Sequence, residues 1–142
     1  MSEIFVAVIS VSGSIVVAAI SYFLTKRQQI NAEWRASKLN HYKMLLSSIS
    51  NLAVDNQDIE AHHQFALAMN TLALVAPQNV VDAMLAFHDG VKITNQTRNN
   101  EFHDQLLSKL LIAIRADLGM RPRDNAVKFH YHLVGAPPRT KK

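Results

Sequence analysis

Cysteine is absent from this chain of 142 residues. Its absence excludes a disulfide framework, a thiolate metal site and a cysteine nucleophile. Aromatic residues are also scarce, at 7% of the chain, and the net charge of +4 is not gathered into a dense basic stripe. A dedicated nucleic-acid module is therefore not indicated, although the positive charge favours contact with anionic lipid or nucleic acid. The length allows one modest domain.

Charge is missing from the whole stretch between Ile4 and Leu24. Its length matches the roughly 20 residues that an α-helix needs to cross the hydrocarbon core of a bilayer. A helix buried in a protein core would show polar residues every second turn. A cleavable signal would carry positive charge before the apolar run, whereas here Glu3 precedes the run and Lys26 and Arg27 follow it. The sequence therefore predicts a retained transmembrane helix over residues 1–25.

The position of the lysine and arginine residues sets the expected orientation. They follow the span, and such residues stay on the cytoplasmic side. We therefore expect a single-pass membrane protein, with the N-terminus outside and everything after Thr25 in the cytoplasm. The lipid bilayer is its first expected partner.

Small side chains fall on one arc of the predicted span when it is drawn at about 100° per residue. They are Ala7, Ser10, Ser14, Ala18 and Ser21. Small residues let helices approach closely in lipid, and hydroxyl groups can bond across the contact. The stripe predicts a homo-oligomer in which these residues form the helix contact or line a narrow pore. The alternative is that the serines are simply tolerated, because each can bond a carbonyl of its own helix.

Glycine and proline are both absent between Gly13 and Pro77. The span can therefore continue as one helix into the following segment, where apolar residues recur mostly at steps of three and four. We expect a break near Val54–Asp58. Further helices are expected over residues 59–76, 78–89 and 101–118.

Apolar periodicity also predicts which residues of these helices face the core. The expected inward residues are Ile59, Phe65, Met69 and Leu72 in the second helix, and Phe102, Leu106, Leu110, Ile114 and Leu118 in the last. Pro77 suits the first turn of the third helix. Gly90 is expected to stop that helix, and Gly119 stands at the C-cap position of the last one.

The chain after Pro122 changes period. Val127, Phe129, Tyr131 and Leu133 alternate with polar residues, which is the spacing of a strand. A lone strand needs an edge to pair with, either on its own bundle or on a neighbouring subunit. The predicted fold is thus all-α. A transmembrane helix continues into a cytosolic bundle of about four helices over residues 26–121, followed by a short extended tail over 122–142.

The sharpest catalytic candidate is the sequence RNNEFH, in which Arg98 and Asn99 precede His103 at the start of the last predicted helix. This element resembles the motif of HEPN domains, which are helical bundles. In the nuclease members two such motifs meet at a dimer interface. The resemblance implies that His103 takes the proton of an RNA 2′-hydroxyl and that Arg98 holds the phosphate charge. The structural alternative is that Arg98 pairs with a neighbouring carboxylate and His103 packs beside Phe102.

Two further groups of polar residues suggest binding sites. Arg115, Arg121 and Arg123 surround a helix end and could bind an anionic ligand, or they could complement the helix dipole as a solvated loop. His130 and His132 share one face of an extended segment and form a weak metal-binding pair. No HExxH motif or acidic cluster completes a metal site, so we expect neither a metal nor a cofactor.

The layout of an N-terminal span, a compact helical cytosolic domain and the element around Arg98 and His103 resembles the membrane-anchored HEPN-like accessory proteins of type VI CRISPR systems, which assemble into membrane pores. It is also similar to small membrane effectors of bacterial antiphage defence. The resemblance implies an inner-membrane pore or gated channel that opens on a trigger. It also implies a regulatory protein or nucleic-acid ligand on the cytosolic side.

Two other functions stay open at this point. One is a membrane-anchored HEPN-type ribonuclease that needs no metal, and the other is a non-catalytic scaffold that holds a partner at the membrane. Subunit number separates them, because a ring of more than four subunits favours a pore and a dimer favours the nuclease or the scaffold.

Overall fold

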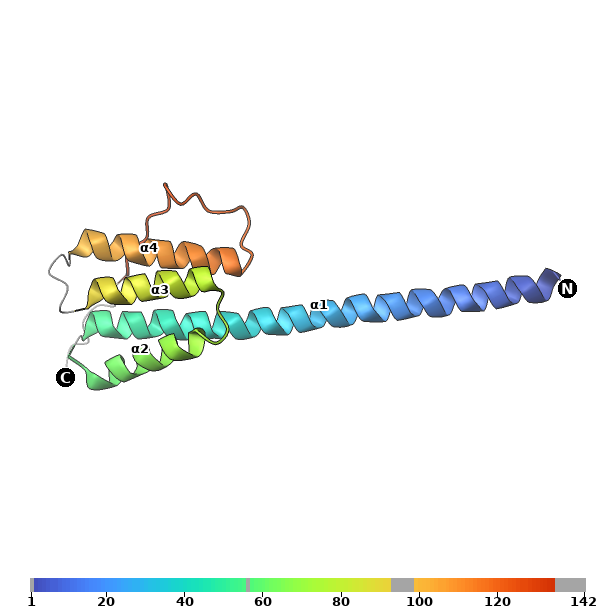
Figure 1. Cartoon of the computed structure of the whole chain (residues 1–142), viewed down its shortest axis with the longest axis horizontal. Coiled ribbons are helices and arrows are strands. Elements are labelled where there is room, and N and C mark those ends of the chain that lie inside the picture. Colours follow the sequence, from blue (N-terminus) through green and yellow to red (C-terminus); the bar gives the residue numbers. More distant parts are fainter. Residues whose placement is uncertain (1, 56, 93–98, 135–142) are drawn as a thin grey trace. The chain divides into compact units, whose positions relative to one another are not determined.

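A computed structural model describes residues 2–55, 57–92 and 99–134, without the side chains of residues 2 and 6–12. These residues contain four helices, which are α1 (Ser2–Val54), α2 (Ile59–Leu72), α3 (Gln78–Val91) and α4 (Asn100–Asp117) (Figure 1). No strand occurs in the ranges described. The all-α prediction is therefore confirmed.

The chain divides into two compact units, Met1–Ser37 and Lys38–Lys142, and α1 contributes residues to both. The boundary between the two units is defined by contacts within the chain. It lies after Ser37, whereas the sequence predicts that the membrane-spanning segment ends at residue 25. In the first unit, every described side chain between residues 13 and 37 is exposed. A search of the described residues, which omits the side chains of 6–12, finds no helix with an apolar stretch long enough to cross a bilayer.

The break between α1 and α2 lies where the sequence predicts it. α1 ends at Val54. Asp58 is the N-cap of α2, and its Oδ1 accepts a hydrogen bond from the backbone N–H of Glu60 at 2.9 Å. The carboxylate thereby satisfies one of the backbone donors that a helix start leaves unpaired.

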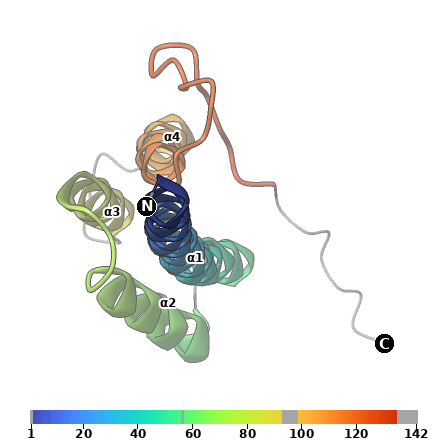
Figure 2. The same ribbon diagram turned by 90° about the vertical axis from the view of Figure 1, so that its right-hand side faces the viewer.

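The second unit has one hydrophobic core to which all four helices contribute. Seen end on, α3 lies between α2 and α4 (Figure 2). The largest side chains that are fully buried are Tyr42, Leu45, Leu72, Val80, Met84, Leu107 and Leu110. Apolar residues at steps of three and four therefore bring the four helices onto a shared core, as their period predicts.

Most of the expected inward residues are buried. Phe65, Met69 and Leu72 of α2 lie in the core. In α4, Leu106, Leu110 and Ile114 are buried, while Phe102 and Leu118 are half-buried against the same core. The prediction for Ile59 is wrong, because this side chain is 85% exposed. Ile59 is the first residue of α2, so it lies at the end of the bundle, beyond the core.

Two helix boundaries differ from the predictions. α2 ends at Leu72, earlier than expected, and Pro77 is the N-cap of α3 instead of a residue of its first turn. Gly90 does not stop α3, which continues to Val91. Gly90 is buried, and a Cβ atom at this position would overlap the side chain of Leu106 on α4. The glycine therefore permits close packing of α3 on α4.

The end of α4 follows the prediction. Gly119 has a φ of 71°, and its N–H bonds the carbonyl of Ala116 at 3.1 Å. The N–H of Met120 bonds the carbonyl of Arg115 at 3.0 Å. These bonds form a Schellman motif, in which a glycine with positive φ stands just after the helix.

The segment after α4 keeps the predicted alternation without forming a strand. Phe129, Tyr131 and Leu133 are half-buried against the core, and the residues between them are exposed. Val127, the first apolar residue of this alternation, is exposed. The hydroxyl of Ser108 on α4 accepts a hydrogen bond from the N–H of Tyr131 at 2.8 Å and donates one to its carbonyl at 3.2 Å. The hydroxyl group of Ser108 thus makes the two hydrogen bonds that a neighbouring strand would otherwise make with Tyr131. The segment therefore packs on its own bundle.

Candidate functional site

The apolar helix of the first unit exposes large side chains over a broad face. Ile15, Val16, Val17 and Ile20 are between 54% and 64% exposed, and Phe23 is 72% exposed. At about 100° per residue, these positions cover an arc of about 200°, and small residues occupy the remaining face. A helix that is apolar all round is normally covered by a protein core or by lipid.

The stripe of small residues lies partly within this exposed helix. Ser14, Ala18 and Ser21 are exposed, whereas the side chains of Ala7 and Ser10 lie outside the residues described. The helix is continuous through all five positions. At about 100° per residue, Ser14, Ala18 and Ser21 lie on one face of this helix.

A polar cluster that the sequence did not suggest joins α1 to the end of α4. The Nζ atom of Lys38 lies 2.9 Å from each carboxylate oxygen of Asp117. The phenol of Tyr42 donates a hydrogen bond to the same carboxylate at 2.6 Å. Asp117 is thus held by two donors from one face of α1.

Burial and position explain why this cluster is needed. Asp117 is the last residue of α4, where the helix dipole disfavours a negative charge, and the ammonium group of Lys38 offsets that cost. Burial of Tyr42, together with its hydrogen bond to Asp117, raises the pKa of the phenol well above its usual range. The phenol therefore stays protonated and acts as a donor.

The start of α4 contains the residues of the HEPN-like element. The Oδ1 atom of Asn99 accepts a hydrogen bond from the N–H of Phe102 at 2.6 Å, so Asn99 is the N-cap of the helix. The ring of His103 packs edge-on against Phe87, with 5.2 Å between the ring centroids, and its Nδ1 lies 3.4 Å from Asp104. Arg98 lies outside the described residues. Asn99 and His103 thus both have structural contacts within the bundle.

The three arginines near the end of α4 do not converge on one site. Arg115 binds both oxygens of Asp124, at 2.6 and 3.0 Å, and its guanidinium carbon lies 5.7 Å from the ring centroid of Phe129. This hydrogen-bonded pair lowers the pKa of the Asp124 carboxyl group. Arg121 and Arg123 are exposed. The ion pair between Arg115 and Asp124 therefore holds the segment after α4 against that helix. Arg121 and Arg123 remain available to a ligand.

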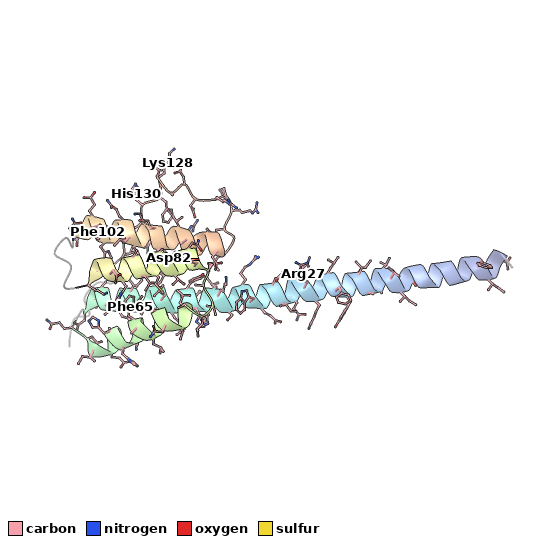
Figure 3. All side chains as sticks on the ribbon, viewed as in Figure 1. Arg27, Phe65, Asp82, Phe102, Lys128 and His130 are labelled. Carbon is pink, nitrogen blue, oxygen red and sulfur yellow. The ribbon has the colours of Figure 1, made fainter. Side chains whose placement is uncertain are left out.

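The histidines bring no metal site together in the described part of the chain. His130 and His132 are both exposed, and His130 lies on the segment that covers α4 (Figure 3). No group of three histidine, aspartate or glutamate residues among those described could hold an ion.

A shallow cavity of about 360 Å³ lies between α1 and α2. Its lining includes the apolar residues Met44 and Leu67 and the polar residues Lys43 and Gln64. The lining includes no carboxylate, histidine or other group suited to acid–base catalysis.

Comparisons of the chain with protein-family models, with curated proteins and with solved structures found no match.

Proposed function

We propose that this chain is a single-span protein of the bacterial inner membrane that self-assembles into a pore. The apolar helix crosses the bilayer with its N-terminus outside, and the helical bundle lies in the cytoplasm. The observation that supports the span is the uncharged run from Ile4 to Leu24, whose large side chains are exposed wherever they are described. A bilayer would cover these side chains, because lipid surrounds a helix on every face.

The proposed pore depends on contacts between copies of this helix. A single span has no second helix of its own chain to pack against in lipid. The face with Ser10, Ser14 and Ser21 offers small side chains and hydroxyl groups, which favour close contact between helices. The proposal places this face at the helix contact or along a narrow aqueous path. The resemblance in layout extends it to an antiphage effector that permeabilises the membrane when triggered from the cytoplasmic side.

Ion flux tests the pore. Full-length protein is reconstituted into vesicles loaded with an ion-sensitive dye. The variants Ser14→Leu and Val16→Leu are compared, because Val16 lies on the face opposite the stripe. We expect Ser14→Leu to abolish flux and the higher oligomer in detergent, while Val16→Leu retains both. Wild-type flux in the Ser14→Leu variant would contradict the proposal, provided that circular dichroism shows the same helix content.

The ribonuclease alternative receives no support from a specific contact. Asn99 caps α4 and His103 packs against Phe87. The scaffold alternative is distinguished by the same flux measurement, since a scaffold would give a membrane-bound protein without flux.

A further inference from the structure

The two ends of the helical bundle differ in charge. At the end where α2 and α4 begin and α3 finishes (Figure 1), carboxylates predominate. They are Asp55, Asp58, Glu60, Asp89, Glu101 and Asp104. Within the described ranges, Lys92 is the only lysine or arginine there, and it binds Asp89 at 2.6 Å. We call this the acidic end.

At the opposite end, where α4 finishes and α3 begins, two carboxylates are neutralised, while Asp82 of α3 is exposed. Asp117 is bound by Lys38, and Asp124 is bound by Arg115. Arg121 and Arg123 follow in the same loop, are exposed and have no ion pair with a described residue. The loop after α4 therefore carries two surplus positive charges. We call this the basic end.

Apolar side chains are also exposed at this end of the bundle (Figure 1). The connection between α2 and α3 contains no polar residue from Leu72 to Pro77. Val75 and Ala76 pack on the core, but Leu74 is 84% exposed. Met120 follows the glycine of the Schellman motif, where an apolar residue commonly packs back on its helix. Here it is 45% exposed.

The chain also enters the bundle unit at the basic end, where Lys38 binds Asp117. Lys38 is the first residue of the bundle unit, and it continues α1 directly from the first unit. Lys26, Arg27 and Arg35 precede it in the same helix. The cytoplasmic surface of a bacterial membrane carries anionic lipids, and basic residues next to a span are attracted to it.

We propose that the basic end, with Arg121, Arg123, Leu74 and Met120, docks on the anionic headgroups of the bilayer in which the protein is anchored. This inference rests on the proposed transmembrane helix. The arginines bind lipid phosphates, for which the planar guanidinium group is suited, while the acidic end is repelled from the same surface. Charge complementarity thus orients the bundle on the membrane.

The length of the connecting helix indicates which lipid layer is within reach. At 1.5 Å per residue, residues 25–37 span about 20 Å when helical. This length exceeds the depth of one headgroup layer, about 5–8 Å, so docking requires this segment to lie along the membrane surface, where the headgroups are the expected contact. A probe of headgroup proximity is the appropriate measurement.

The absence of cysteine permits a direct experiment with the full-length chain. Met120→Cys places a fluorophore at the basic end, and Ile59→Cys places one at the acidic end as the matched control. Each protein is reconstituted into vesicles of phosphatidylglycerol and phosphatidylcholine that contain a lipid with a nitroxide on its headgroup. We expect several-fold stronger quenching at position 120 than at position 59, and loss of the difference at high salt.

Charge variants identify the residues responsible. In the Met120→Cys background, Arg121→Gln with Arg123→Gln is expected to reduce quenching to the level of the control site. Lys109→Gln with Lys128→Gln removes two other exposed positive charges and is expected to leave quenching unchanged. Lys128 lies on the segment that covers α4 (Figure 3), so this pair separates a local effect from one of net charge.

Each remaining outcome has a distinct meaning. Equal quenching at positions 120 and 59, in protein that resists alkaline extraction, would overturn the docking inference and leave the span intact. Extraction of the protein by alkali would overturn both the span and the docking. Equally strong quenching at position 120 in vesicles of phosphatidylcholine alone would exclude headgroup charge as the cause. Crosslinking of the Met120→Cys variant, through its new thiol, to the acidic end of a second copy would assign the basic end to a protein contact instead.

Discussion

The hydroxyl group of Ser108 bonds both backbone groups of Tyr131, which lies 23 residues later in the chain. Ser108 is only 5% exposed, so its removal would leave the backbone N–H and carbonyl of Tyr131 without a partner. We expect Ser108→Ala to lower the free energy of unfolding by about 1–3 kcal/mol. It should also make the chain after α4 more sensitive to protease.

Ser47→Ala is the matched control for this prediction, because Ser47 is exposed on α1. Its effect should be within about 0.5 kcal/mol. Urea unfolding and limited proteolysis measure both effects. Equal stability and equal cleavage in the two variants would show that the serine does not hold the segment.

Lys38 and Asp117 join segments that are 79 residues apart. Their side chains are 15% and 12% exposed, so Lys38→Met would leave a poorly solvated carboxylate at the negative end of α4. We expect a loss of about 1–3 kcal/mol. Lys109→Met, at an exposed position of α4, should change stability by less than about 0.5 kcal/mol.

The double variant Lys38→Met/Asp117→Asn tests whether the loss comes from the ion pair. Removing the carboxylate charge should restore part of the stability, because the uncompensated group is no longer ionised. Strictly additive losses would argue against a direct interaction between the two residues.

The raised pKa of the Tyr42 phenol predicts that the protein loses stability in alkaline solution. Its folded-state pKa is raised by burial and by the carboxylate of Asp117, while the unfolded phenol ionises near pH 10. The stabilisation is therefore fully present below about pH 10 and is lost as the pH rises from there toward the folded-state pKa. The unfolding midpoint should fall more steeply above pH 10 in wild type than in Tyr42→Phe, and parallel curves would contradict the assignment.

The close approach of Gly90 and Leu106 predicts that a larger side chain at position 90 lowers the free energy of unfolding. A methyl group at position 90 would overlap Leu106, so Gly90→Ala should cost about 1–3 kcal/mol despite its better helix propensity. Gly90→Ala/Leu106→Ala should recover part of the loss due to Gly90→Ala, relative to Leu106→Ala alone. Thermal unfolding of the four proteins completes this cycle, and additive effects would show that the two sites do not touch.

The sequence predicts the helices well because local signals define them. The lack of glycine and proline between Gly13 and Pro77 allows α1 to continue to Val54. The glycine at position 119 ends α4 because it adopts a positive φ. Apolar steps of three and four identify most of the core, and Ile59 fails because periodicity does not indicate where a core stops.

Contacts between distant segments were not predictable in this way. Lys38 and Asp117 each look like ordinary surface residues in the sequence, and only the packing of α1 on α4 pairs them. Gly90 resembles a helix stop, although its role depends on Leu106 of another helix. Arg115 was a ligand-binding candidate, but the structure pairs it with Asp124. These roles follow from tertiary contacts, which residue type and spacing do not specify.

The central claim is that the apolar helix crosses a membrane, and the accessibility of its two sides tests it most directly. Ser2→Cys and Ile59→Cys each introduce a single cysteine into the cysteine-free chain. Intact bacterial cells are treated with a maleimide that cannot cross the inner membrane but reaches the periplasm. The account predicts labelling of the Ser2→Cys variant in intact cells and labelling of the Ile59→Cys variant only after the inner membrane is broken. Labelling of both variants only after breakage would contradict it.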